Sequence, residues 1–171
     1  MSQPTAPAKP ASPPRARRAS LRFLVEPTDL NSGGKVHGGT VMKWIDQAGY
    51  ACAVGWCGTF CVTVYVGGIR FMRPIAVGSL VELNARLVHT GNTSMHIAVE
   101  VRACDPRDGI YERTTQCIIV FVSLGADLKP TAVPPWSPED DRDRELHRYA
   151  TRHHELWQQI ERDLEAKPGG P

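Results

Sequence analysis

The 171-residue sequence predicts an α+β domain in which a single helix lies against one face of an antiparallel sheet. Residues 41–54 are apolar or small on nearly every side, which is typical of a largely enclosed helix. Later segments alternate apolar and polar residues with the period of two of half-buried strands. The links between these segments are too short for parallel crossovers, so we expect antiparallel neighbours.

The first twenty residues are rich in Pro, Ala, Ser and Arg and contain no acidic residue. A segment of this composition buries little apolar surface, so we predict a disordered arm over residues 1–20. Its basic cluster of Arg15, Arg17 and Arg18 also fits an anion contact or a transit peptide, but a solvated tail is the simpler interpretation. The folded domain is expected over residues 21–135.

The domain should begin with a short apolar run at 21–25, followed by a loop dense in turn formers at 28–35. The predicted helix comes next, and Gly55 and Gly58 mark its end. Four strands are expected after it, over 62–74 with a break at Gly67-Gly68, then over 81–87, 95–101 and 114–124.

The remaining segment, residues 136–171, is expected to form an amphipathic helix and a tail. Ser137 as N-cap, Pro138 at the first helical position and the acids Glu139 and Asp140 are typical of a helix start. The polar face mixes charge signs, so we expect packing on the chain's own sheet or on a neighbouring subunit rather than on a membrane. The apolar face is formed by Leu146, Tyr149, Trp157, Ile160 and Leu164, with His153 between them.

Composition argues against several classes of protein. The formal net charge of +2 gives no bulk case for a nucleic-acid-binding protein, and no apolar run reaches the roughly 20 residues of a membrane helix. The five cysteines are an odd number without a secretory signal, which favours reduced thiols in the cytoplasm. Cys57 and Cys61 lack a second Cys or His pair at zinc spacing, so no metal site is expected.

Asp46 is the one acid inside the predicted helix. Burying an unpaired carboxylate costs on the order of several kcal/mol, so this residue requires an explanation. One interpretation is a structural ion pair with Lys43, Arg70 or Arg73. The other is a catalytic acid or base, because carboxylates in such surroundings are frequent in active sites. The helix alone leaves both open.

Gly38 and Gly39, just before the helix, favour the catalytic interpretation. Glycines there allow a ligand to approach the backbone, and first-turn N–H groups are free donors at the positive end of the helix dipole. Such donors can polarise a carbonyl as an oxyanion hole does, with Asp46 about two turns further along. A tight turn into the helix is the simpler alternative for the glycine pair.

Several short motifs follow one another along the chain. They are the stretch from Asn31 through Val36-His37-Gly38-Gly39-Thr40 to Asp46, then Val62-Thr63-Val64, Phe71-x-x-Pro74-Ile75 and Thr90-Gly91-Asn92-Thr93-Ser94. This set resembles the signature of the acyl-CoA hydrolase subfamily of hotdog thioesterases. The resemblance covers residues 21–134.

The resemblance implies a hotdog fold, in which an antiparallel sheet wraps around one long helix. It also implies a homodimer, in some members a hexamer, that cleaves acyl-CoA to a free acid and CoA with no metal or other cofactor. Asp46 then corresponds to the catalytic acid, Asn31 to the asparagine that faces it from the other subunit, and Gly39 to the donor for the thioester oxygen. Thr63 lies on the strand that lines the site.

The substrate-binding set implied by the same resemblance has one gap. Relatives often carry Arg-Ser-Ser where this chain has Asn92-Thr93-Ser94, so a CoA phosphate needs another arginine. Arg forks match phosphate geometry, and Arg70, Arg73 and Arg86 are the candidates. The expected substrate-binding residues are His37, Gly38, Thr63, Arg70, Arg73, Asn92, Thr93 and Ser94.

Two other functions remain open at this point. Hotdog hydratases and dehydratases pair an Asp with a His, but His37 precedes Asp46 by nine residues and would not share its helical turn. A non-catalytic acyl-CoA-binding or sensor module would bind without turnover. Whether Asp46 acts as general base or as nucleophile is also left open.

Overall fold

The structure is a computed structural model that describes residues 15–165, so residues 1–14 of the expected arm and 166–171 of the expected tail lie outside it. Its elements in chain order are β1 (Arg18–Leu24), the 3-10 turn η1 (Pro27–Asp29), α1 (Gly38–Cys57), β2 (Phe60–Phe71), β3 (Leu80–Thr90), β4 (Ser94–Cys104), β5 (Glu112–Leu124) and α2 (Asp141–Glu165).

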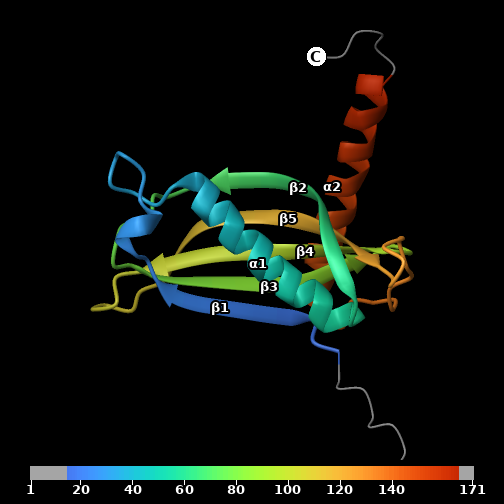
Figure 1. Cartoon of the computed structure of the whole chain (residues 1–171), viewed down its shortest axis with the longest axis horizontal. Coiled ribbons are helices and arrows are strands. Elements are labelled where there is room, and N and C mark those ends of the chain that lie inside the picture. Colours follow the sequence, from blue (N-terminus) through green and yellow to red (C-terminus); the bar gives the residue numbers. More distant parts are fainter. Residues whose placement is uncertain (1–14, 166–171) are drawn as a thin grey trace, which may run out of the picture.

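The five strands form one sheet in the order β1-β3-β4-β5-β2, and every neighbouring pair is antiparallel. Helix α1 crosses one face of this sheet and contacts all five strands, while α2 lies behind it (Figure 1). The predicted α+β fold, an antiparallel sheet around one long helix with a helical C-terminal extension, is therefore confirmed.

Strand β5 is apolar at consecutive positions because both of its faces are covered. Ile119 and Phe121 join the core under α1, whereas Ile118 and Val120 pack with Ala150 of α2. A strand between a helix and solvent would need apolar residues only at alternate positions. The sheet is thus the middle layer of three.

Helix α1 buries residues three and four positions apart, as a helix with one covered face does. They are Val41, Trp44, Ile45, Ala48, Gly49, Cys52 and Ala53. Gly49 brings the helix unusually near the sheet, because a Cβ at this position would lie 2.8 Å from the Phe121 ring and 2.9 Å from Ile119.

The other flank of α1 is less enclosed than the sequence predicted. Met42 and Tyr50, one turn on either side of Asp46, are 44% and 37% exposed, and Asp46 itself is half-buried. Some of the apolar residues that suggested enclosure on all sides, such as Met42 and Tyr50, are therefore exposed beside β2 in a single chain.

Two strand boundaries also differ from expectation. β1 begins at Arg18, so residues 18–20, which were expected in the disordered arm, pair with β3 instead. β2 is a single strand from Phe60 to Phe71, and the expected break at Gly67-Gly68 is one of its two register shifts against β5. Bulges of this kind let a strand bend without ending.

The expected start of the C-terminal helix at Ser137 is wrong. α2 begins at Asp141, and the side chain of Asp140 accepts a 2.6 Å hydrogen bond from the Asp143 N–H, as an N-cap does. The preceding segment is held along the sheet, where the Trp136 N–H donates to Thr90 Oγ1 at 3.0 Å. Tertiary hydrogen bonding therefore keeps these residues extended despite their good capping sequence.

A buried carboxylate joins α2 to the start of the sheet. Asp143 is 0% exposed and accepts hydrogen bonds from Arg17 at 2.7 and 2.9 Å, and it also forms an ion pair with Arg86. Burial opposes its ionisation, but the Glu139 N–H and the two guanidinium groups lower the pKa of Asp143 below its usual value. Arg17, which was expected to be solvated, is thus part of the fold.

Replacing Asp143 by Asn should destabilise the protein strongly, because Arg17 and Arg86 lose the one fully buried carboxylate that they share and keep only the more exposed Glu139 and Asp140. We expect a loss of about 3–5 kcal/mol in denaturant unfolding. Asp141→Asn is the matched control, since that side chain is 98% exposed and its pair with Arg144 should contribute less than about 1 kcal/mol. Equal losses in the two variants would contradict a special role for Asp143.

Five of the six histidines gather between the sheet and α2. Ring centroids are 4.9 Å apart for His89 and His96, 5.1 Å for His89 and His147, and 5.0 Å for His96 and His154. Burial, and secondarily repulsion from the other histidines, lowers the pKa of His96 to about 3 and also lowers the pKa values of His89 and His153.

This cluster predicts a loss of stability in acid. Below the usual histidine pKa of about 6.5, these histidines bind protons in the unfolded chain but remain neutral in the folded chain. The free energy of unfolding is therefore highest above pH 6.5 and declines as the pH falls. His96 alone should remove about 2 kcal/mol at pH 5. Unfolding free energies at pH 7 and pH 5 measure this decline. In His96→Gln the difference between the two values should be smaller by about 2 kcal/mol, whatever the absolute stability of the variant. An unchanged decline would contradict the assignment.

Candidate active site

Asp46 and Thr63 form a hydrogen-bonded pair at the edge of the sheet. Asp46 lies on the open flank of α1, and the Thr63 hydroxyl on the edge strand β2 donates to its carboxylate at 2.5 Å. Within residues 15–165 Asp46 forms no ion pair, so the alternative partners Lys43, Arg70 and Arg73 do not neutralise it there. A hydroxyl donor orients the carboxylate and leaves its charge in place.

The start of α1 is capped by His37. Its Nδ1 accepts a hydrogen bond from the Gly39 N–H at 2.9 Å, and its carbonyl accepts from Thr40 and Val41. The N–H of Gly39, expected to bind the thioester oxygen, is therefore engaged by a side chain. Among the described residues the Gly38 N–H has no acceptor, so it is the free donor of this first turn.

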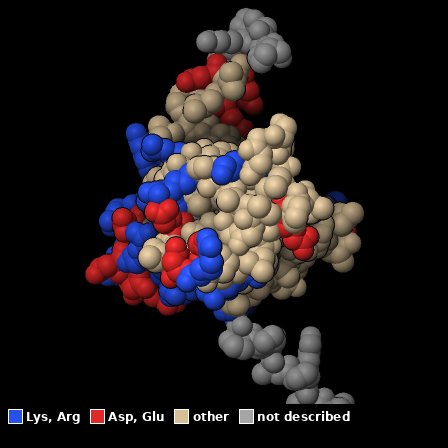
Figure 2. All heavy atoms as spheres, turned by 90° about the vertical axis from the view of Figure 1, so that its left-hand side faces the viewer, with Lys and Arg blue, Asp and Glu red and all other residues tan. Residues whose placement is uncertain are grey.

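Asn31, Gly38 and Arg73 come together in a groove of about 400 Å³ at the same end of α1. The Asn31 side-chain oxygen accepts from the N–H groups of Gly33 and Lys35 at 2.9 and 3.3 Å, which leaves its amide N–H groups as the part able to meet a ligand. Lys35 adds an ammonium that the sequence did not single out. Figure 2 views this end, where mixed charges border a broad uncharged surface.

The predicted phosphate-binding residues are divided between the two ends of the sheet. Arg73 lies where α1 begins and is held by both carboxylate oxygens of Glu112 at 2.8 Å, although both side chains are more than half exposed. Arg70 is exposed and makes no ion pair within the described part of the chain. The turn of Asn92, Thr93 and Ser94 lies where α1 ends (Figure 1).

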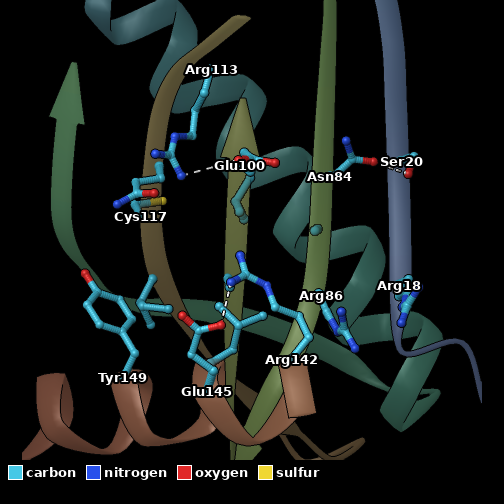
Figure 3. A pocket seen from close by; sticks show the side chains of 16 residues that line it. Arg18, Ser20, Asn84, Arg86, Glu100, Arg113, Cys117, Arg142, Glu145 and Tyr149 are labelled. Atoms are coloured by element: carbon cyan, nitrogen blue, oxygen red, sulfur yellow. Dashed lines mark hydrogen bonds and ion pairs between the residues drawn. The ribbon is translucent and has the colours of Figure 1, made fainter. Parts of the chain in front are cut away.

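A second groove, of about 480 Å³, lies on the opposite face beside α2. Arg86, Arg113 and Arg142 reach into it, together with Arg18 from β1 (Figure 3). Most of this positive charge is already paired, for example Arg142 with Glu145 at 2.7 Å and Arg113 with Glu100 at 3.6 Å. Neither Asp46 nor the start of α1 lines this groove, so the hydrolytic candidate is not there.

Within residues 15–165 no helix is long and apolar enough to cross a membrane. The same part of the chain contains no group of three or more His, Cys, Asp or Glu residues arranged to hold a metal ion. The candidate site itself contains a carboxylate, a hydroxyl, an amide and backbone N–H groups.

Sequence reasoning missed two features of this site. His37, which is expected to bind substrate, is also the helix cap, a role that the sequence did not suggest because Ser, Thr, Asp or Asn usually takes this position. The Glu112 partner of Arg73 follows from strand pairing between β2 and β5, and a single sequence does not give that register.

Known proteins are similar to this chain both in sequence and in fold. Residues 33–110 match the family model of the Thioesterase superfamily. Acyl-CoA thioester hydrolase YciA of Escherichia coli is 35% identical over 117 residues, which are 67% of this chain and 89% of YciA. Protein VdlD of Helicobacter pylori is 31% identical over 129 residues, 75% of this chain and 72% of VdlD.

Solved structures are similar over most of the chain. An acyl-CoA hydrolase from Staphylococcus aureus, in complex with butyryl coenzyme A, coenzyme A and coenzyme A disulfide, has a TM-score of 0.81 at 25% identity and covers 88% of this chain and 92% of its own. Alanine variants of an asparagine, an aspartate and a threonine of that enzyme have also been solved. An apo-hexameric acyl-CoA thioesterase has a TM-score of 0.81 at 28% identity, over 85% of this chain and 93% of that one. The chain therefore belongs to the acyl-CoA thioesterases of the thioesterase superfamily and has their hotdog fold.

Proposed function

We propose that this enzyme hydrolyses acyl-CoA thioesters to a free carboxylic acid and CoA, with Asp46 as the catalytic acid/base. The observation that carries the proposal is the Asp46–Thr63 hydrogen bond on the open flank of α1. It places an oriented carboxylate that has no ion-pair partner among the described residues beside a free edge strand. The five free cysteines agree with a cytoplasmic location.

Spacing along the chain supports this set of residues. Asn31, Asp46 and Thr63 follow one another at intervals of 15 and 17 residues, and the asparagine, aspartate and threonine replaced in the S. aureus enzyme have the same two intervals. Coincidence of both intervals in a protein of the same fold favours a shared role for the three side chains.

In the reaction, first-turn N–H groups of α1 donate hydrogen bonds to the thioester carbonyl oxygen, and the helix dipole stabilises the negative charge that develops on that oxygen. Gly38 offers its N–H directly, while Gly39 does so once the His37 ring turns aside. As a general base, Asp46 takes a proton from water while the water oxygen bonds to the carbonyl carbon. The C–S bond then breaks, and the CoA sulfur leaves with a proton. As a nucleophile, Asp46 would instead bond to that carbon while the C–S bond breaks and the CoA thiolate leaves, and water would then cleave the resulting anhydride to the free acid and the Asp46 carboxylate.

A second copy of the chain completes the site in this proposal. β2 is an edge strand, and its Phe60, Val64 and Phe71 are all at least half exposed, beside Met42 and Tyr50 of α1. An apolar edge of this kind is covered in stable proteins, and strand addition by a partner covers it. The partner then supplies its Asn31 to the Asp46 of this chain. Assembly beyond the dimer, to a hexamer, follows the similar structures.

The CoA part of the substrate is proposed to contact His37, Gly38, Thr63, Arg70, Arg73 and the turn of Asn92, Thr93 and Ser94. Arg73 is available despite its Glu112 partner, because exposed ion pairs are weak and a phosphate competes with the carboxylate. A hydratase is disfavoured, since His37 is engaged at the helix cap and does not meet Asp46.

Asp46→Asn tests the catalytic assignment, because the amide keeps the shape and an acceptor for Thr63 but cannot take a proton. Release of free CoA from acyl-CoAs should fall by about 10²–10⁴-fold, with oligomeric state and unfolding midpoint unchanged. Asp163→Asn, at the exposed end of α2, is the control and should keep full turnover. Full turnover in Asp46→Asn would remove Asp46 from the mechanism, and tight acyl-CoA binding without turnover in the natural protein would favour the binding-module alternative.

Mixing two inactive variants tests the shared site. Asn31→Ala and Asp46→Ala are each expected to be inactive, and a mixed dimer has one site with both residues intact. Co-refolded protein should therefore recover about one quarter of the natural activity, as random pairing about a two-fold axis requires. Recovery to no more than the sum of the separate variants would place Asn31 and Asp46 in the same subunit's site.

A further inference from the structure

Two cysteines meet at the end of α1, away from the hydrolytic site. Cys57 is the last residue of the helix and Cys61 the second residue of β2. Between them Gly58 adopts a left-handed conformation, with φ of +73°, and its N–H donates to the Val54 carbonyl at 2.8 Å. This reversal brings the two Sγ atoms to 3.3 Å from each other.

The two thiols differ in their surroundings. Cys57 is partly exposed, while Cys61 is buried. The Thr59 hydroxyl donates to Cys57 Sγ at 3.1 Å and also contacts Ser123 Oγ at 2.6 Å. Hydrogen bonding from Cys61 lowers the pKa of Cys57 to about 5, burial opposes this, and Thr59 adds to it. A thiolate is the form that attacks a disulfide sulfur.

The other three cysteines provide an internal contrast. Cys52, Cys104 and Cys117 are buried, and among the described residues no second thiol contacts any of them. Burial raises the pKa of Cys52 and of Cys117 to about 12, which keeps both as thiols. Buried cysteines of this type are chemically inert.

We propose that Cys57 and Cys61 are a redox-reactive dithiol that low-molecular-weight disulfides oxidise to an intramolecular disulfide. The Cys57 thiolate attacks one sulfur of the reagent, forming a mixed disulfide and releasing one thiolate. Cys61 then gives its proton to the released thiolate and attacks the Cys57 sulfur, which expels the second reagent thiolate. The two protein thiols are oxidised, and one reagent disulfide is reduced to two thiols.

The geometry suits reversible closure. A disulfide is about 2.05 Å long, so the two sulfur atoms need to approach by little more than a side-chain rotation. The bond would close a loop of only four residues' separation, and short loops gain little stability from a crosslink. A bond that stabilises the fold little is suited to being made and broken.

The test uses the reduced natural protein and glutathione disulfide. Thiols counted after denaturation should fall from five to three, with no glutathione attached, and dithiothreitol should restore all five. The tryptic peptide of residues 44–70 should lose the mass of two hydrogen atoms. Retention of five thiols, or a stable glutathione adduct on the natural protein, would overturn the proposal.

Serine variants assign the two roles. Cys61→Ser lacks the second thiol and should hold glutathione on Cys57, whereas Cys57→Ser should not react. Cys52→Ser is the matched control, because Cys52 lies in the same tryptic peptide, and it should close the disulfide as the natural protein does. Loss of the disulfide in Cys52→Ser would reassign the pair. The readout counts thiols, so it is independent of acyl-CoA hydrolysis and of Asp46.

Discussion

The close approach of α1 to the sheet at Gly49 is the constraint on which the rest of the structure depends. Only a residue without a side chain leaves room for Phe121 and Ile119 to rise from β5 against the helix. Because the helix is seated there, Asp46, three residues earlier, falls at the margin of the contact and not within it. The distance between helix and sheet thus decides that the carboxylate meets Thr63 and a free edge and not the core.

The two faces of the sheet serve different purposes. The α1 face carries the Asp46 carboxylate, the capped helix start and an uncovered flank, all of which agree with the proposed site that another subunit completes. The α2 face is held by packing and by charge, through Ala150, Asp143 and the histidine cluster. Asp46 forms no hydrogen bond or ion pair with a described residue of this second face.

Much of this arrangement could be predicted from local pattern. The alternating strands and the apolar helix follow from which faces are covered, and Asp46 was visible as the one acidic residue in its helix. Features that depend on contacts between residues far apart in the chain could not be predicted. A helix begins at Asp141 and not at Ser137 because Thr90 holds Trp136, and Arg17 is ordered because Asp143 lies across from it. The availability of the Gly39 N–H likewise depended on the rotamer of His37.

The ion pairs of Asp143 also set an order of events while the chain is being made. Arg17 and Arg86 emerge from the ribosome long before the carboxylate that neutralises them, since the N-terminal parts of a chain appear first. During that interval β1 can pair with β3, but two guanidinium groups at this end lack their counter-charge. The last quarter of the chain therefore stabilises the start of the first strand. A nascent protein released before residue 143 would lack the ion pairs that join α2 to Arg17, next to β1, and to β3.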